Sequence, residues 1–203
     1  MFNPKKRNRI SEQVTIAFYR IAQAIGYLLR ERGKHMLLSP SQINALLFLR
    51  YARPGVRNIG GLAERLGTTY ATSSGVADSL EKKRLIIRKP LPADQRVITL
   101  DLTNEGEAQV EQLEDVLDEI EKAIETLPEQ EQTILLHATK AIVRHLQNAG
   151  YVKVYEMCWG CQFFRKNAHP DDPRGPHHCI FIDASLTENG AYYECPDFVP
   201  IND

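Results

Sequence analysis

Residues 58–102, NIGGLAERLGTTYATSSGVADSLEKKRLIIRKPLPADQRVITLDL, decide the fold of this chain. Their first half predicts two short helices. Asn58 can cap the first, which runs through GLAERLG, and the second runs from about Tyr70 to Lys83. The dipeptide Thr68-Thr69 lies between them. Two short helices separated by a turn have the helix-turn-helix form, so this half predicts that motif.

The second half of this stretch predicts a β-hairpin. LIIRKP and RVITLDL are rich in apolar and β-branched residues, and the loop between them contains Pro92, Ala93 and Asp94. Two short runs of this composition on either side of a proline-containing loop are typical of paired strands. A hairpin that follows a helix-turn-helix is a wing.

Two helices are predicted before this stretch. From Ser11 to about Arg32 apolar residues recur at steps of three and four, which indicates one helix, and Gly33 is expected to end it. A second helix, INALLFLRYAR, follows the segment 39–42, in which Ser39 can cap, Pro40 fits the first helical position and Gln42 can complete a capping box. The apolar stripe of the first helix consists of Val14, Phe18, Ile21, Ile25 and Leu28.

Two more helices are predicted after the hairpin. Thr103 can cap a long acidic helix, and a capping box of Thr126 and Glu129 around Pro128 can open a last helix that Gly150 ends. Their apolar stripes are Val110, Leu113, Leu117, Ile120 and Ile124, and then Ile134, Leu135, Ala138, Ile142 and Leu146. The fold class is therefore mainly α with a small β-hairpin wing (α+β).

The net charge of −1 conceals a strong asymmetry along the chain. Residues 1–100 carry a net charge of +12, residues 101–149 carry −9 and residues 150–203 carry −4. A basic first half followed by acidic segments indicates that one region meets a polyanion, although uneven charge on solvated faces would give the same counts. No apolar stretch has the ~18 residues that a membrane span needs, and no apolar signal segment follows the basic N-terminus, so we expect a cytoplasmic protein.

Over residues 8–149 the sequence resembles the MarR family. The resemblance rests on GLAERLG before the second helix of the motif, SLEKKRLIIRKP entering the wing, PADQR at its tip and LDLTNEG at the start of the acidic helix. It implies a homodimer in which the first helix and the last two pack against their counterparts in the partner chain. It also implies DNA-dependent transcription control, and we expect repression. Packing of the apolar stripes within one chain is the alternative to a dimer.

The resemblance also implies which residues meet double-stranded DNA. In the family the second helix of the motif enters the major groove and the wing tip reaches the neighbouring minor groove. The family's Asp-x-Arg pattern falls on Asp94 and Arg96, where a carboxylate can fix the direction of a guanidinium entering a narrow groove, or where the pair is only an exposed salt bridge. The hydroxyl groups expected at base edges and phosphates belong to Thr69, Tyr70, Thr72, Ser73 and Ser74.

Two departures from the family pattern predict that direct base readout is thin. Gly75 and Ser79 stand where relatives often carry basic or larger side chains, and Arg84 replaces a glycine that usually follows the helix. We therefore expect phosphate contacts to supply more of the affinity. The cations expected to make them are Lys82, Lys83, Arg84, Arg88 and Arg96, with Lys5, Lys6, Arg7 and Arg9 of the N-terminal tail either joining them or serving only as a disordered solubilising segment.

Residues 150–203 lie beyond the resemblance and predict a second, metal-stabilised module. Its cysteines are Cys158, Cys161, Cys179 and Cys195. A C-x-x-C turn aims two thiolates at one point, and two more cysteines can close a tetrahedral site. A segment this short cannot bury a self-sufficient core, so a metal is expected to supply the missing folding free energy.

The metal and the role of the module stay open at this point. Zinc is expected because it suits a compact closed site, an iron–sulfur cluster is the alternative, and reactive thiols without a metal are a third interpretation. His177 and His178 can replace a cysteine or hydrogen-bond to a thiolate, or they are an exposed pair in a proline-rich loop. The module either braces the protein or responds to a redox or small-molecule effector.

The predicted organisation is a winged-helix and dimerisation domain, residues 1–149, followed by a metal module, residues 150–203. We expect no enzyme, because the serines, histidines and acids form no recognisable catalytic arrangement. The rival to a DNA-binding regulator is a protein-interaction scaffold that holds a partner through a winged helix and a structural zinc module. The thin second helix favours that rival, whereas the basic first half and the wing pattern favour the regulator.

Overall fold

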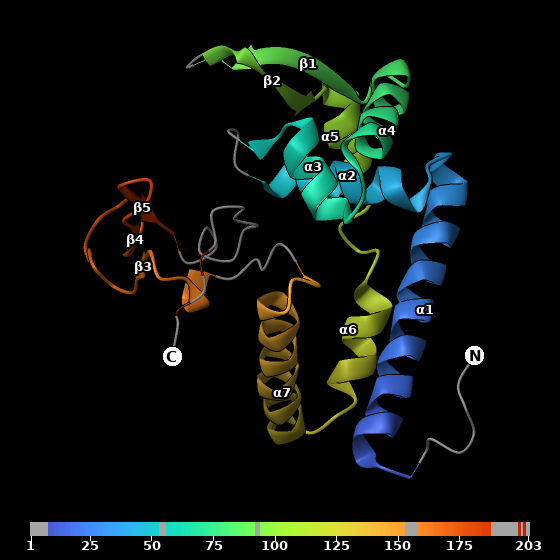
Figure 1. Cartoon of the computed structure of the whole chain (residues 1–203), viewed down its shortest axis with the longest axis vertical. Coiled ribbons are helices and arrows are strands. Elements are labelled where there is room, and N and C mark those ends of the chain that lie inside the picture. The colour runs from blue at the N-terminus through green and yellow to red at the C-terminus, as the bar shows by residue number, and fades with distance from the viewer. Residues whose placement is uncertain are drawn as a thin grey trace.

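The computed structural model describes residues 8–52, 56–91, 94–152, 158–187, 199 and 201. Figure 1 shows a compact head of short helices and a hairpin, from which α1 runs away along one side with α6 and α7 beside it. The elements in chain order are α1 (Ile10–Met36), α2 (Pro40–Tyr51), α3 (Ile59–Leu66), α4 (Tyr70–Lys82), β1 (Ile86–Leu91), β2 (Asp94–Leu102), α5 (Asn104–Glu111), α6 (Asp118–Glu125), α7 (Glu129–Asn148), the short 3-10 helix η2 (Cys158–Gly160), β3 (Phe164–Arg165), β4 (His177–Cys179) and β5 (Ala184–Leu186).

The predicted helix starts in the head are confirmed by their caps. The Ser39 hydroxyl accepts from the Gln42 backbone N–H (3.2 Å), and the Gln42 side chain accepts from the Ser39 N–H (3.0 Å). Asn58 caps α3 and Thr69 caps α4 in the same way, each through its side-chain oxygen. The structure therefore contains the helix-turn-helix as α3 and α4.

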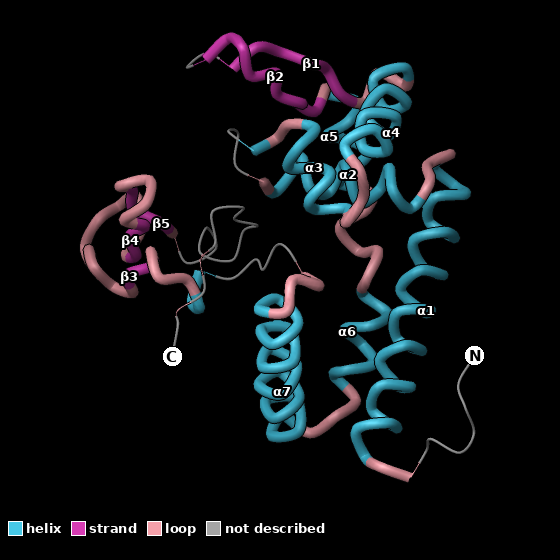
Figure 2. Tube along the Cα trace, viewed as in Figure 1, coloured by secondary structure: helices cyan, strands magenta, loops and turns pink. Residues whose placement is uncertain are grey.

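The predicted hairpin is also present. β1 and β2 pair antiparallel from Ile86 opposite Leu102 to Pro90 opposite Ile98, and the register shifts between Pro90 and Leu91. Pro92 and Ala93 at the tip lie outside the described residues. The wing extends away from α4 across the top of Figure 2.

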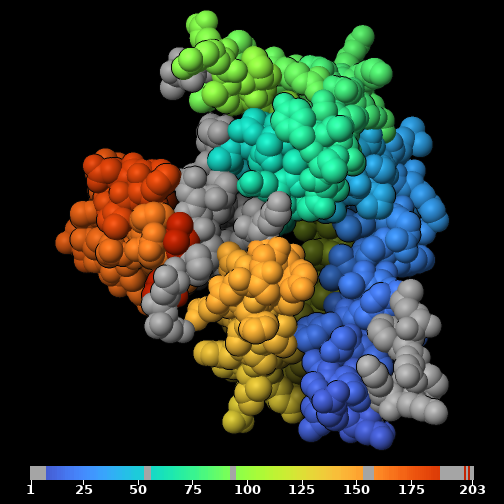
Figure 3. Space-filling model, viewed as in Figure 1, coloured from blue at the N-terminus to red at the C-terminus, as the bar shows by residue number. Residues whose placement is uncertain are grey.

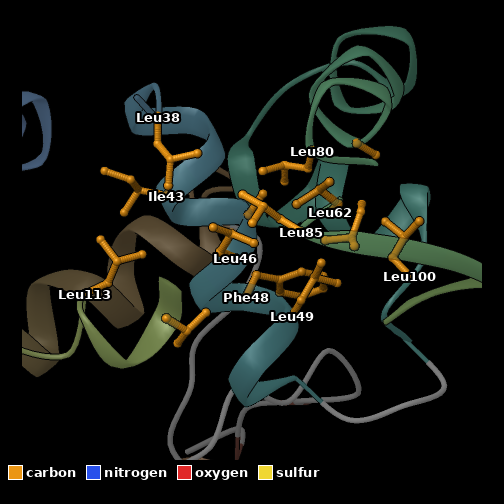
Figure 4. Packing of buried hydrophobic residues seen from close by; sticks show 14 of the residues in the cluster. Leu38, Ile43, Leu46, Phe48, Leu49, Leu62, Leu80, Leu85, Leu100 and Leu113 are labelled. Atoms are coloured by element: carbon orange, nitrogen blue, oxygen red, sulfur yellow. The ribbon is translucent and has the colours of Figure 1, made fainter. Parts of the chain in front are cut away.

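One apolar core holds the winged head, which we define as α2, α3, α4, α5 and the wing. Figure 4 shows leucines and isoleucines from different elements converging on α2. The side chains larger than alanine with no exposed surface in this core are Ile43, Leu46, Leu49, Leu62, Leu80, Leu100, Val110 and Leu113. Val110 and Leu113 come from the predicted dimerisation stripe, so part of that stripe packs within the chain.

The prediction that Gly33 ends the first helix is wrong. α1 continues to Met36 and ends at Leu37, which adopts the left-handed conformation (φ 55°). Gly33 instead lets the chain return over the helix, because Leu38 donates its N–H to the Gly33 carbonyl (2.8 Å). A Cβ at Gly33 would meet the Leu38 carbonyl oxygen at 2.2 Å, so the glycine serves a close approach.

The predicted long acidic helix is two helices, α5 and α6, separated by turns at residues 112–117. Arg32 of α1 donates to the Gln112 carbonyl and pairs with Asp115 (2.7 Å). In a continuous helix that carbonyl would accept from Val116, whose N–H donates to Leu113 instead (3.0 Å). A contact with a distant arginine therefore accompanies the break.

The predicted capping box at Thr126 is also absent. Pro128 occupies the cap position of α7 without a side-chain cap, and the Thr126 hydroxyl donates back to the Ala123 carbonyl (2.7 Å). The predicted end of α7 is confirmed, because Gly150 follows the helix in a positive-φ conformation (φ 78°).

The extension, residues 150–203, contains a three-stranded antiparallel sheet in the order β3-β4-β5. Its described strands and turns form a lobe at one side of the molecule in Figure 3, coloured orange to red. Within the described part of the chain, no helix is both long and apolar enough to cross a membrane.

Candidate nucleic-acid interface

The N-terminal half of α4 presents hydroxyl groups to solvent. Thr69, Tyr70 and Thr72 are exposed, and 65% of the Tyr70 surface is accessible. The Thr69 and Thr72 hydroxyls lie 2.9 Å apart, and Ser74 is half-buried beside them. Because the first turn of α4 also carries free backbone N–H groups at its start, this end of the helix can accept phosphate and base-edge contacts.

Ser73, which was also expected at the DNA, is fully buried. Its hydroxyl lies 2.9 Å from the Thr68 hydroxyl, across the turn between α3 and α4. The side chain therefore stabilises the turn, and the expectation that it faces DNA is corrected.

The C-terminal end of α4 carries the predicted cations in three different situations. Lys82 is exposed. The Lys83 ammonium donates to the Leu37 carbonyl and to Gln42 Oε1 (3.1 Å), so it joins α4 to the start of α2. Arg84 is exposed and left-handed (φ 60°), the conformation that the missing family glycine would adopt without strain.

Arg88 connects the wing to α4. From β1 its guanidinium pairs with Asp78 (2.5 Å) and with Glu81, both on α4. Partial burial works to lower the pKa of Arg88, but the hydrogen bonds and charges of the two carboxylates outweigh it and the pKa is raised. Arg88 thus offsets two negative charges on the outer face of α4.

Sequence reasoning missed the role of the acids that hold Arg88 and of Gln42. Asp78 and Glu81 are three residues apart on one helix, a spacing that places them on the same face and that would have indicated a shared cation. Gln42 is 7% exposed, and its amide donates to the Ser79 hydroxyl (2.8 Å). That bond explains why α4 carries a small polar residue at Ser79.

The wing tip is described in part. Arg96 is exposed on β2, close to the tip, whereas the side chain of Asp94 lies outside the described residues. In the N-terminal tail, residues 1–7, with Lys5, Lys6 and Arg7, are likewise outside them. Arg9 pairs with Glu12 (2.8 Å) at the end of α1 that lies far from the head, so it does not join the basic surface of the wing.

In the extension, the C-x-x-C segment forms a tight turn. The Cys161 N–H donates to the Cys158 carbonyl (2.8 Å), and Cys179 lies on β4 directly opposite Phe164, three residues after Cys161. Cys195 lies outside the described residues. Among the residues that the structure does describe, no three His, Cys, Asp or Glu side chains come together as a metal site.

His177 belongs to the same face of the extension's sheet as Cys179, because side chains two residues apart on a strand point the same way. It is fully buried, with its ring 5.2 Å from that of Trp159 and 5.1 Å from that of Phe164. Its Nδ1 accepts from the Asn167 N–H (3.1 Å). Because Nδ1 accepts this hydrogen bond, Nε2 is the ring nitrogen that can donate one, which suits a hydrogen bond to a thiolate better than metal ligation.

An apolar groove of about 710 Å³ runs between α1, α6 and α7. Phe18 and Ile21 line it from α1, Ile124 from α6, and Leu135 and Leu136 from α7. α7 buries none of its residues in this chain, and Ile134, Leu136, Ile142 and Leu146 are between 37% and 61% exposed. Much of the apolar surface of these helices is therefore uncovered.

Comparisons with known proteins agree with this geometry. Residues 38–97, from the start of α2 into β2, match the model of the MarR family. The chain is 28% identical over 109 residues to the HTH-type transcriptional repressor MdtR of Bacillus subtilis (strain 168), covering 54% of this chain and 69% of that protein.

Two solved structures are also similar to this chain. YusO from Bacillus subtilis is 26% identical with a TM-score of 0.50, and the match covers 66% of this chain and 95% of YusO. The transcriptional repressor CouR, bound to a 23-mer DNA duplex, is 26% identical with a TM-score of 0.55, covering 67% of this chain and 96% of CouR. The chain therefore contains a winged helix-turn-helix, in which residues 38–97 match the model of the MarR family.

Proposed function

We propose that this protein is a DNA-binding transcriptional repressor that acts as a homodimer. The observation that carries the proposal is the surface of the winged head, where the exposed hydroxyls of Thr69, Tyr70 and Thr72 lie on the helix that the wing flanks. The similarity to MdtR and to a DNA-bound CouR supports it. Binding of duplex DNA by wild type and variants, described in the Discussion, tests it.

In this proposal α4 enters the major groove and the wing follows the backbone to the minor groove. Lys82, Arg84 and Arg96 are exposed around these elements and contact phosphates or the groove. Arg88 and Lys83 are held by partners within the chain, so they fix the relative positions of α4, the wing and α2. The affinity then depends strongly on salt, because phosphate contacts release counterions.

In this proposal a second copy of the chain covers the groove between α1, α6 and α7. Exposed apolar residues on three neighbouring helices bury the largest surface when they pack against the same helices of a second chain, as in other helical dimers. The lining of the groove supplies part of the surface that the dimer buries. A dimer also places two winged heads on one duplex, as a symmetric operator requires.

We expect light scattering at micromolar concentration to give twice the chain mass of 23.1 kDa. Ile21→Glu, in the groove, should shift the protein to monomer, because a carboxylate would be buried in the apolar interface. Ile98→Glu on the wing is the matched control, since both isoleucines are 44% exposed in the single chain. A monomer mass for the wild type, or equal dimerisation of both variants, would contradict the homodimer.

We further propose that the extension holds one metal centre through Cys158, Cys161, Cys179 and Cys195, with zinc as the metal and an iron–sulfur cluster as the alternative. The C-x-x-C turn and the position of Cys179 opposite Phe164 support the ligand set. The fully buried His177, with a proton on Nε2, suits a neighbouring thiolate. Oxidation of the thiolates would release the metal and give the repressor a redox response.

Serine at any one of these cysteines is expected to abolish stoichiometric metal binding at the cysteine centre and to loosen the extension. Serine keeps the volume of cysteine but is a much poorer ligand for a soft metal site. Metal analysis, with an absorption spectrum of anaerobically purified protein, measures the loss and separates zinc from a coloured cluster. Limited proteolysis should then cut near Gly150 and leave a fragment that still binds DNA. Full metal retention in all four variants, or unfolding of the whole dimer in one, would show that the site or the boundary is misplaced.

A further inference from the structure

Two histidines of the extension face each other on the side of the sheet away from Cys179. His169 Nε2 and His178 Nδ1 lie 3.3 Å apart, and their rings meet edge to face at 82° with centroids 5.0 Å apart. His178 follows the buried His177 on β4, so strand alternation places it on the opposite face from His177 and Cys179. The pair therefore lies on the opposite face of the sheet from Cys179.

Backbone hydrogen bonds hold both histidines in place. His178 is in the central strand, opposite Arg165 of β3 and Ser185 of β5. His169 donates its N–H to the Pro176 carbonyl (3.0 Å), and its carbonyl accepts from the Asp172 N–H (3.0 Å). These bonds close the loop 169–176. Holding the two rings together therefore does not require a long free segment to become ordered.

A carboxylate lies beside the His178 ring, on a side chain that is 95% exposed. Asp183 Oδ1 lies 3.4 Å from His178 Nε2, on the far side of the ring from His169. In the tautomer with the ring proton on Nε2, toward Asp183, the lone pair of Nδ1 is directed at His169. A carboxylate behind a histidine is the usual support of a metal-ligating imidazole.

The other carboxylate nearby is already occupied. Asp172 accepts from Arg174 Nε (3.0 Å) and Nη2 (2.8 Å) and from the Ser185 hydroxyl (2.8 Å). The pKa of Asp172 lies well below its usual range, mainly because Arg174 donates hydrogen bonds to the carboxylate. Asp172 therefore stabilises the loop. The candidate ligand atoms at this place are the two histidine nitrogens that face each other.

We propose that His169 Nε2 and His178 Nδ1 bind a divalent transition metal ion, with zinc as the best fit. Two nitrogen ligands of a tetrahedral zinc ion, at about 2.0–2.1 Å from the metal, lie roughly 3.3–3.4 Å from each other. The observed separation of 3.3 Å matches that value. Imidazole nitrogens are suitable ligands for zinc, copper and nickel.

This site differs in kind from the cysteine centre. His169 is exposed, whereas 17% of the His178 side chain is accessible, so the remaining coordination positions open to water. Zinc bound there exchanges with the solution, unlike zinc in a closed four-cysteine site. The proposal does not depend on DNA binding or on the metal at the cysteines.

Zinc titration of the full-length protein by equilibrium dialysis tests the site. We expect wild type and His145→Gln to bind one more zinc ion per chain than His169→Gln. His145 is the matched control because it is an exposed histidine on α7, outside the extension. Asp183→Asn should keep the ion but bind it about 10–100-fold more weakly, as expected for loss of a carboxylate behind a ligand.

Thiol reactivity, measured on the same samples, reports the cysteine centre independently. Equal reactivity in His169→Gln and wild type, together with the loss of one zinc ion, supports the histidine site whether or not the cysteines hold metal. Equal zinc binding by wild type and His169→Gln would overturn it, because the pair would then share only a proton.

Discussion

Replacing Leu80 with alanine is expected to lower the free energy of unfolding by about 2–5 kcal/mol, the usual cost of truncating a fully buried leucine. Leu80 has no exposed surface and attaches α4 to the core of the winged head. Figure 4 shows it converging with Leu62 and Leu46 from α3 and α2. Truncation leaves a cavity directly behind the helix that is proposed to contact DNA.

Urea denaturation followed by circular dichroism, at one fixed protein concentration, measures this loss. Leu37→Ala is the matched control, because 81% of Leu37 is exposed and its truncation should change stability by less than about 0.5 kcal/mol. Equal midpoints for the two variants would mean that α4 is not packed on this core.

Replacing Arg96 with alanine is expected to weaken duplex binding by about 1–3 kcal/mol, or roughly 5–150-fold in Kd. Arg96 is exposed on β2 near the wing tip, where an arginine can enter the minor groove. Arg20→Ala is the control, since Arg20 is exposed on α1, outside the winged head. Gel-shift titrations at one salt concentration give the comparison, and unchanged affinity for Arg96→Ala would make it an ordinary surface residue.

Local sequence signals predicted the head well because each acts over a few residues. The caps at Ser39, Asn58, Thr69 and Thr103 each satisfy an N–H group three positions away, so the helix starts could be placed without knowing the fold. The sequence predictions were wrong where a residue far away in the chain determines the local structure. The acidic helix breaks where Arg32, 80 residues earlier, takes the Gln112 carbonyl.

The same distinction separates the interface residues. Exposure of Thr69, Tyr70 and Thr72 follows from their place on the first turn of α4, which the sequence predicted. Burial of Ser73 depends on packing across the helix-turn-helix, and the partners of Arg88 are its neighbours only once the wing folds back on α4. Residue type alone does not distinguish a cation that contacts phosphate from one that positions a helix.

In the extension, the cysteine spacing is visible in the sequence but the histidine pair is not. His169 and His178 are nine residues apart, and only the loop that closes through Pro176 brings their rings together. No short motif encodes that approach. The position of Cys195 lies outside the described residues, so its place in the metal centre stays a prediction.

The most direct test of a dimeric DNA-binding regulator is the salt dependence of duplex binding, measured by fluorescence anisotropy with a labelled duplex. Lys82, Arg84 and Arg96 from each protomer bring six cations to the phosphates and the narrow groove between them, so log K against log salt should fall with a slope of about −5. Lys82→Ala removes one contact per protomer and should make that slope less steep by about 2. Saturable binding at about 50 mM salt with this slope is the predicted result. Absence of binding at that salt concentration, or a slope near zero, would contradict the account.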